Sequence, residues 1–365
     1  MNMDTLLVGT RKGLFTLRGN EVARVSFLGT AVTAVLQRNG AIYAAVGHGH
    51  FGAKLHRSMD EGETWQEVAA PKWPEKPADI DDRSPTTGAP VPWSLNQMWV
   101  FEADPREPQA LWCGTIPGGL FHSTNGGDSW RLLRPLWDKP ERRQWFGGGY
   151  DFPGIHSICV DPRDPRRVLV GVSCGGAWQT DNGGESWSVA SRGMFAAYMP
   201  PEKAEDPVIQ DPHRIVRCAG APDVFWAQHH NGVFRSIDGA QSWQEVKINP
   251  SSFGFAVAVH PRDPDTAWFV PAIKDELRVP VEGALVVTRT RNGGKSFETL
   301  RSGLPQRHAY HLIYRHGLEV APDGQTLAMG STTGTLWLSR DAGESWTALS
   351  RDLPPVYCVR FGGAA

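Results

Sequence analysis

The residues best suited to chemistry in this sequence are three histidines that open similar apolar segments. His156 begins HSICVDP, His213 begins HRIVRC and His316 begins HGLEVAP. If these segments are equivalent strands, their first side chains converge. Neutral imidazoles from three strands can hold a divalent metal with an open coordination position, or supply an acid or base near neutral pH. One interpretation is therefore a divalent metal at His156, His213 and His316, and the alternative is simple hydrogen bonding to nearby carbonyls.

Carboxylates beside these histidines are the second set of candidates. Asp151 follows Tyr150 in GGGYDFPG and comes just before His156, so we predict Tyr150, Asp151 and His156 as catalytic residues. Two carboxyl groups at a suitable separation can hydrolyse a glycoside, one as acid and the other as base or nucleophile. Asp275 and Glu276 form another acidic pair. We expect a further acidic group to be solvated in a loop: Asp79, Asp81 and Asp82.

Aromatic, basic and polar side chains in the predicted loops are candidates for ligand binding. Flat aromatic rings stack on sugars and other cyclic ligands, and a few polar groups fix the ligand's orientation. For most individual aromatics, capping of strand ends is the alternative. The predicted ligand-binding residues are Arg11, Lys12, His48, His50, Trp93, Asn96, Trp145, His229, His230, Tyr310, His311 and Tyr357.

An eight-residue repeat indicates which elements must position these residues. The pattern Ser/Thr-x-Asp/Asn-x-Gly-x-Ser/Thr-Trp/Phe occurs six times, with closing aromatics 49 to 65 residues apart, and the fourth copy has Ala240 in place of Gly. This spacing fits four short strands with their turns. The Asp or Asn can accept hydrogen bonds from its own turn, and Gly supplies a positive φ. The copies end at Trp65, Trp130, Trp187, Trp243, Phe297 and Trp346.

Strand-like segments with period-two alternation surround each copy, so one unit predicts a four-stranded sheet. Residues 5–19 resemble the second and third strands of a unit, and 355–361 resembles its missing first strand. Pairing of the two chain ends would close a ring and leave no free sheet edge. The sequence therefore predicts an all-β, seven-bladed β-propeller as a single domain over 1–365. The predicted blades are 1–29 with 355–361, 30–68, 94–133, 154–189, 212–247, 252–300 and 312–350.

Long connections distinguish one face of this predicted ring. Insertions on one face of a rigid scaffold are where binding sites are commonly built. Nine of the twelve histidines are expected on the same face: His48, His50, His156, His213, His229, His230, His308, His311 and His316. The insertions are 69–93, 134–153, 190–211, 271–283 and 301–311.

Composition excludes several classes of partner. The 37 Lys and Arg residues nearly balance the 39 Asp and Glu residues, and no run of five like charges occurs, so neither a nucleic acid nor an anionic membrane is expected. No apolar run approaches the roughly 20 residues of a membrane helix. The five cysteines are scattered, and the N-terminus does not resemble a signal peptide, which favours a cytoplasmic location. The oligomeric state is not predicted.

The repeat resembles the Asp-box, or BNR repeat, of sialidases and related glycoside hydrolase-like β-propellers, and the resemblance covers essentially the whole chain. It implies that each box lies in the turn between the third and fourth strands of a blade, with Asp60, Asp238 and Asp341 as turn stabilisers. Sialidases carry an Arg-Ile-Pro motif in the first blade, whereas this chain has GTRKGLF with Arg11 and Lys12. Sialidase activity is therefore not expected.

Three functions remain open from the sequence. The first, implied by the resemblance, is a glycoside hydrolase-like enzyme that binds a sugar or similar small polar ligand at the mouth of the propeller channel. The second is a His-centred, metal-assisted lyase or hydrolase. The third is a non-catalytic binding or assembly scaffold, the role of similar Asp-box propellers in photosystem assembly.

Overall fold

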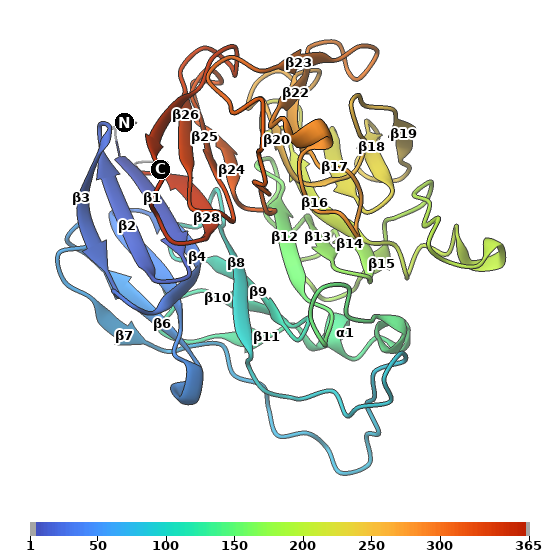
Figure 1. Cartoon of the computed structure of the whole chain (residues 1–365). Helices are drawn as coiled ribbons and strands as arrows, with labels where there is room; N and C mark the ends of the chain where they lie inside the picture. Colours follow the sequence, from blue (N-terminus) through green and yellow to red (C-terminus); the bar gives the residue numbers. More distant parts are fainter. Residues whose placement is uncertain (1–4, 363–365) are drawn as a thin grey trace.

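The computed structural model describes residues 5–362, which form seven four-stranded antiparallel sheets around a common centre (Figure 1). In six sheets the strands are neighbours in chain order, so each sheet is a meander. Tight turns alternate with apolar, β-branched and aromatic segments, and such segments favour the half-buried surface of a sheet. The all-β, seven-bladed propeller predicted from the sequence is confirmed.

The strands have the following bounds. The first sheet combines both chain ends, β28 (Val356–Phe361), β1 (Thr5–Thr10), β2 (Gly13–Arg18) and β3 (Glu21–Ser26). The second contains β4 (Ala31–Arg38), β5 (Ala41–Gly47), β6 (Ala53–Ser58) and β7 (Gln66–Val68), and the third β8 (Gln97–Ala103), β9 (Leu111–Ile116), β10 (Leu120–Ser123) and β11 (Arg131–Leu132). The fourth contains β12 (Ile155–Val160), β13 (Val168–Val172), β14 (Gly176–Thr180) and β15 (Ser188–Val189).

The remaining three sheets complete the ring. The fifth contains β16 (Pro212–Arg217), β17 (Phe225–His229), β18 (Gly232–Ser236) and β19 (Gln244–Val246), and the sixth β20 (Gly254–Val259), β21 (Ala267–Pro271), β22 (Val287–Thr290) and β23 (Glu298–Leu300). The seventh contains β24 (Leu318–Val320), β25 (Leu327–Gly330), β26 (Leu336–Ser339) and β27 (Thr347–Ser350).

Helical segments occur only in connections within residues 5–362. They are α1 (Arg134–Trp137) and the 3₁₀ helices η1 (Gly49–Phe51), η2 (Pro140–Gln144), η3 (Pro201–Lys203) and η4 (Val281–Gly283). Among these helices, none has the length and apolar character needed to cross a bilayer.

The two ends of the described chain close the ring. β28 pairs antiparallel with β1, with Val359 opposite Val8. The innermost strands then contact one another in the order β28, β4, β8, β12, β16, β20 and β24, and β24 contacts β28 again. Pairing of the C-terminal strand with the N-terminal strands is therefore confirmed.

The repeated motif forms the same hydrogen-bonded turn in six sheets. In its first copy the Ser58 hydroxyl donates to Asp60 at 2.7 Å, the Gly62 amide donates to the Ser58 hydroxyl at 2.8 Å, and the Thr64 amide donates to Asp60 at 2.9 Å. Equivalent bonds occur in the other copies, with Asn in place of Asp in three of them. These acceptors satisfy turn amides that no strand partner reaches.

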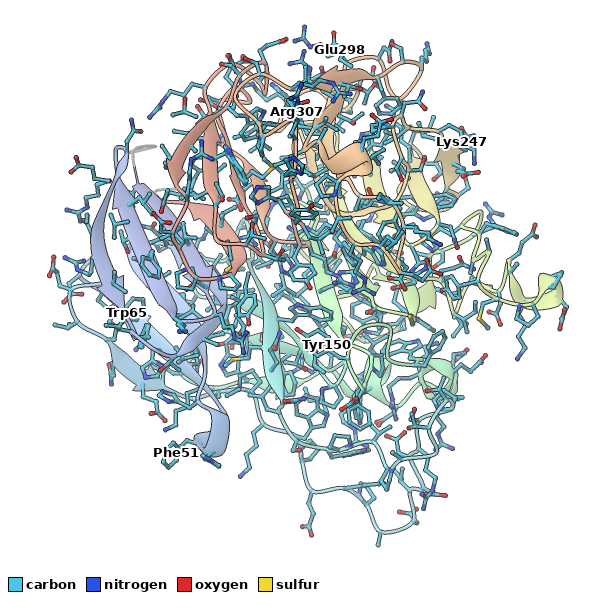
Figure 2. The ribbon with its side chains drawn as sticks, in the orientation of Figure 1. Phe51, Trp65, Tyr150, Lys247, Glu298 and Arg307 are labelled. Carbon is cyan, nitrogen blue, oxygen red and sulfur yellow. The ribbon has the colours of Figure 1, made fainter. Side chains whose placement is uncertain are left out.

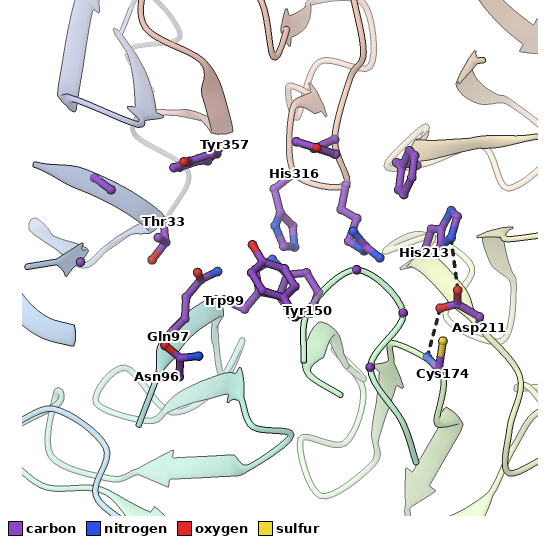
Figure 3. Close-up of a pocket in the computed structure, with 18 of the residues that line it drawn as sticks. Thr33, Asn96, Gln97, Trp99, Tyr150, Cys174, Asp211, His213, His316 and Tyr357 are labelled. Atoms are coloured by element: carbon purple, nitrogen blue, oxygen red, sulfur yellow. Dashed lines mark hydrogen bonds and ion pairs between the residues drawn. The ribbon is translucent and has the colours of Figure 1, made fainter. Parts of the chain in front are cut away.

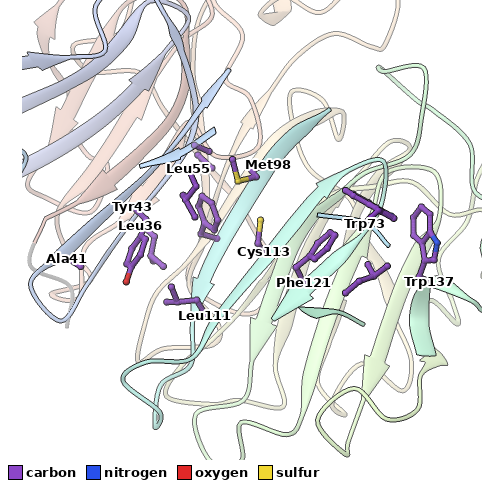
Figure 4. Close-up of a cluster of buried hydrophobic side chains, with 14 of the residues drawn as sticks. Leu36, Ala41, Tyr43, Leu55, Trp73, Met98, Leu111, Cys113, Phe121 and Trp137 are labelled. Carbon is purple, nitrogen blue, oxygen red and sulfur yellow. The ribbon is translucent and has the colours of Figure 1, made fainter. Parts of the chain in front are cut away.

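Apolar side chains fill the spaces between neighbouring sheets. One cluster joins Leu36 and Leu55 of the second sheet to Leu111 and Phe121 of the third, as Figure 4 shows. Burial of a side chain as large as Phe121 contributes about 1.5–3 kcal/mol. Glycine permits the close approach at the ring's inside, because a Cβ on Gly114 would lie 2.5 Å from the carbonyl oxygen of the next inner strand.

A buried ion pair connects two of the long insertions. Asp82, expected from the sequence to be a solvated loop acid, is fully buried instead. It accepts from Arg142 at 2.7 Å and from the indole nitrogen of Trp93 at 3.1 Å, so 69–93 is tied to 134–153. The expectation was wrong because a partner 60 residues away cannot be read from the acidic run itself. Asp79 and Asp81 are exposed as expected.

Candidate functional site

A cavity of about 910 Å³ opens at the centre of the ring, on the face that carries the long insertions. It lies where the innermost strands begin, and the connections that precede those strands form its rim. Figure 2 shows Tyr150 near the centre of the ring, while Phe51 and Lys247 lie at its periphery. The cavity therefore occupies the mouth of the propeller channel.

β-bulges aim several side chains at this mouth. The pairing register shifts at Thr33 in β4, at Trp99 in β8, at His156 in β12 and at His213 in β16. A bulge leaves the extra residue unpaired and re-aims its side chain. Of these four residues, Thr33, Trp99 and His213 line the cavity (Figure 3), whereas His156 is fully buried behind its wall.

Asp211, His213 and His230 form the tightest polar group of the cavity. The Asp211 carboxylate lies 3.4 Å from His213 Nε2 and 3.4 Å from His230 Nδ1. Its other oxygen accepts the Cys174 amide at 3.1 Å, and Figure 3 marks the contacts with His213 and Cys174. Asp211 precedes the bulge at the start of β16, and His230 directly follows β17, which pairs with β16. One local pairing thus brings all three together.

The surroundings favour an ionised Asp211 and a neutral His213. Burial acts to raise the pKa of Asp211, but His213, His230 and the charge of Arg315 together hold that pKa well below its usual range. Burial lowers the pKa of His213, although Asp211 opposes this shift. The neighbouring His229 is fully buried, and burial lowers its pKa to about 3.

Arg315 places a positive charge on the cavity wall without a counter-ion. Its guanidinium lies 4.9 Å from the centre of the Trp99 ring and 5.3 Å from that of Phe255. Among residues 5–362 no carboxylate lies within ion-pair distance of Arg315, and its buried Nε has no hydrogen-bond partner. Burial lowers its pKa, with the nearby Asp211 opposing the shift. This side chain is free to bind an anionic group of a ligand.

The three histidines predicted as metal ligands have different surroundings. His316 Nε2 lies 2.8 Å from the carbonyl oxygen of His156, and His156 Nδ1 lies 2.9 Å from the Ser157 hydroxyl. Only His213 belongs to the compact group with Asp211 and His230. A metal shared by His156, His213 and His316 stays a prediction.

The predicted catalytic residues are separated by the cavity wall. Tyr150 lines the cavity, and its ring lies 5.2 Å from that of Trp99 in an edge-to-face contact. Asp151 is exposed and lies outside the lining. His156 is buried beneath Trp99, with ring centres 5.4 Å apart. Tyr150 and His156 thus both contact the indole ring of Trp99.

The predicted ligand-binding residues divide into two groups. Four line the cavity, namely His48, Asn96, His230 and Tyr357. The others lie outside the lining, namely Arg11, Lys12, His50, Trp93, Trp145, His229, Tyr310 and His311. Trp145 packs on Trp178, and His311 contacts the Thr333 hydroxyl, so both take part in local packing.

Sequence reasoning missed several residues of the site, among them Asp211, Arg315, Trp99 and Phe255. Two of them could have been predicted from their positions in the sequence. Asp211 lies two residues before His213, and Arg315 directly precedes His316, so both belong to strand starts that the histidines had already marked. No local pattern distinguishes Trp99 or Phe255 from the other core aromatics.

Comparison with known proteins supports the fold. No family model matches the chain. It is 23% identical over 309 residues to a probable oligoxyloglucan-reducing end-specific xyloglucanase of Neosartorya fischeri, covering 75% of this chain and 35% of that protein. It is 24% identical over 288 residues to the oligoxyloglucan-reducing end-specific xyloglucanase of Emericella nidulans, covering 71% and 33%. The chain thus spans about a third of the length of the curated relatives it matches.

Solved structures show the same architecture. A GH74 xyloglucanase from Xanthomonas campestris has a TM-score of 0.65 at 15% identity, covering 95% of this chain and 53% of that chain. This chain is a β-propeller similar in fold to that xyloglucanase. YCF48 bound to a D1 peptide has a TM-score of 0.56 at 12% identity, covering 92% of this chain and 88% of that one. At such identities the likeness shows the fold alone, and the resemblance to sialidases stays a prediction.

Proposed function

We propose that this propeller is a carbohydrate-active protein that binds a short saccharide with an acidic substituent in the mouth cavity. The proposal rests on two side chains that line the same cavity. Tyr150 exposes an aromatic ring, and Arg315 lacks a counter-ion. The likeness to xyloglucanases supports a sugar as the ligand class.

Stacking surface and hydrogen-bonding groups suit a sugar ring. Tyr150 is 46% exposed, and Tyr314 and Tyr357 line the same cavity. Aromatic faces contact the apolar faces of pyranose rings, while Asn96 and Gln97 can donate to or accept from hydroxyl groups. A cavity of about 910 Å³ accommodates a short oligosaccharide.

The positive charge of Arg315 favours a saccharide that carries an acidic substituent. Arg315 is held between two aromatic rings with its Nε unpaired, so a carboxylate can form a charge-assisted, bidentate contact there. Arg278, the other arginine of the lining, already pairs with Asp275. The selectivity for an acidic sugar therefore depends on Arg315.

Hydrolysis by a carboxylate pair requires an acid whose pKa is raised. Within the described lining, the pKa values of Asp211 and Glu276 are both lowered, the latter by its own backbone amide and by Lys274. Binding is therefore the better supported part of the proposal. The predicted role of Asp151 as a catalytic carboxylate is tested by loss of turnover of aryl glycosides in Asp151→Asn.

A binding panel tests the proposal. Isothermal titration calorimetry with xyloglucan, cello- and uronate-containing oligosaccharides should detect binding, strongest for the uronates. Tyr150→Ala should weaken that binding by roughly 3- to 10-fold, the value of one aromatic contact. Tyr310→Ala is the matched control, because Tyr310 is 63% exposed and lies outside the cavity lining. Equal effects of both variants, or no binding by wild type, would contradict the proposal.

A further inference from the structure

The cavity holds a second recognition element that the proposed saccharide site does not require. Asp211 Oδ2, His213 Nε2 and His230 Nδ1 all lie within 4.8 Å of one another. We propose that Asp211, His213 and His230 bind one divalent cation of the zinc class, with a coordination position left open to the cavity.

The two distances from Asp211 to the histidine nitrogens fit a tetrahedral ion. Zn²⁺ binds nitrogen and oxygen at about 2.0–2.1 Å, which places neighbouring tetrahedral ligands about 3.4 Å apart. An octahedral ion with the same bond lengths would bring them to about 3.0 Å. Both contacts of Asp211 Oδ2, with His213 Nε2 and with His230 Nδ1, measure 3.4 Å. Imidazole and carboxylate are also the ligands that Zn²⁺ accepts in three-ligand sites.

Hydrogen bonding aims a lone pair of His213 at the carboxylate. His213 Nδ1 lies 2.6 Å from the carbonyl oxygen of Gly254, and a carbonyl can only accept, so Nδ1 carries the proton. In the neutral ring Nε2 is then an acceptor facing Asp211 Oδ2, which is an acceptor too. Two acceptors that face each other at 3.4 Å are an arrangement that a bound cation would bridge.

Packing holds the ligands in these orientations. The His213 ring stacks on Phe255 at 4.3 Å and 7°, and the His230 ring contacts that of Tyr198 edge-on at 4.9 Å. The Cys174 amide fixes Asp211 by donating to Oδ1. Outer contacts of this kind, which fix tautomer and carboxylate orientation, are typical of metal sites.

The free coordination position of the proposed metal ion faces the cavity. All three ligands belong to the cavity lining, and Arg315 lines the same cavity. Catalytic zinc sites likewise have three protein ligands and leave the fourth position for water or substrate. An oxygen of a carboxylate or hydroxyl group is the ligand that such a position would take.

Metal binding is measured without any saccharide, so its failure is distinct from failure of the proposed function. Chelator-treated protein of residues 1–365 is titrated with Zn²⁺ by calorimetry, and native mass spectrometry gives the stoichiometry. We expect one equivalent in wild type. We expect a loss of affinity of at least about 100-fold in His230→Ala and in the nearly isosteric Asp211→Asn, since loss of an outer contact alone costs 10- to 100-fold. His50→Ala, at an exposed histidine outside the cavity, should bind like wild type.

Cobalt supplies a spectroscopic readout. Co²⁺ in the same site should give intense visible bands of tetrahedral coordination without a thiolate-to-cobalt band, because Cys174 is not among the proposed ligands. Circular dichroism is used to check that His230→Ala is folded. The proposal is overturned if wild type binds no Zn²⁺, or if folded His230→Ala retains wild-type affinity.

Discussion

Ion pairing differs between the buried Asp161 on the face with the repeated turns and Arg315 in the mouth cavity. On the face with the repeated turns, the buried Asp161 carboxylate has two arginine partners, Arg163 and Arg217. At the mouth, Arg315 has no carboxylate partner within the described chain, and Asp211 faces an imidazole acceptor. A buried ion pair stabilises the fold, whereas a charged group without an ion-pair partner is available to a ligand. We therefore assign Asp161, which has ion-pair partners, to the fold, and Arg315, which has none, to ligand binding.

The largest expected effect comes from breaking the buried ion pair between Asp161 and Arg217 on the turn face. Asp161 is 1% exposed and lies 2.7 Å from Arg217, which is 8% exposed. Asp161→Ala leaves Arg217 buried without its partner, and such losses cost about 3–5 kcal/mol of unfolding free energy. Chemical denaturation measures the loss, and Zn²⁺ and saccharide binding should be unchanged while the protein is folded.

Asp164→Ala is the control for Asp161, because the Asp164 pair with Arg166 is largely exposed. Exposed pairs contribute at most about 1 kcal/mol. If Asp161→Ala destabilised the protein no more than Asp164→Ala, the buried ion pair of Asp161 would not contribute to the stability of the turn face.

An intermediate effect is expected at the mouth, on binding instead of stability. Arg315→Met removes the free guanidinium and should weaken binding of uronate-containing oligosaccharides by roughly 10- to 100-fold, the value of a charged hydrogen bond. Neutral oligosaccharides should lose much less. The melting temperature should fall only slightly, since Arg315 has no ion pair to lose and gives up only its contacts with the Trp99 and Phe255 rings.

Arg307→Met, at an exposed arginine of the 301–311 insertion, is the matched control (Figure 2). Calorimetry on both variants gives the comparison. A large loss of stability in Arg315→Met with unchanged saccharide binding would contradict this prediction. Arg315 would then stabilise the fold and would not bind the ligand.

The smallest effect is expected within the repeated turns. Three of the six turns use Asn where the others use Asp, so Asp341→Asn should change the unfolding free energy by less than about 0.5 kcal/mol at pH 7. Burial opposes ionisation of Asp341, but hydrogen bonds from Ser345 and Ser339 hold its pKa below the usual value. Its contribution is thus present above the unfolded value of about 3.9 and lost as the pH falls below it.

Denaturation curves at pH 7 and at pH values below 4 check this sign. Wild type should lose stability on acidification more steeply than Asp341→Asn. If wild type and Asp341→Asn lost the same unfolding free energy on acidification, ionisation of the Asp341 carboxyl group would not contribute to stability.

The sequence predicted the fold well and the site only in part, for a physical reason. The repeated turn is a local structure, so Asp60, Gly62 and Trp65 report it within eight residues. The site depends on bulges and on the convergence of separate strands, which no short segment encodes. His213, Tyr150 and Tyr357 were predicted and do line the cavity, but Asp211 and Arg315 were missed.

Burial was the other property that sequence could not supply. Asp82 was placed among solvated acids, because the neighbouring Asp79 and Asp81 are exposed and its partner Arg142 lies in another insertion. Trp145 was predicted to bind ligand, yet it is 2% exposed and packs on Trp178. In both cases a distant segment covers the residue.

A crystal structure with the tightest-binding oligosaccharide tests the central claim most directly. The account predicts a sugar ring stacked on Tyr150, its acidic group on Arg315, and no ligand on the turn face. Saccharide density outside the mouth cavity, or none in the cavity at saturating concentration, would contradict it.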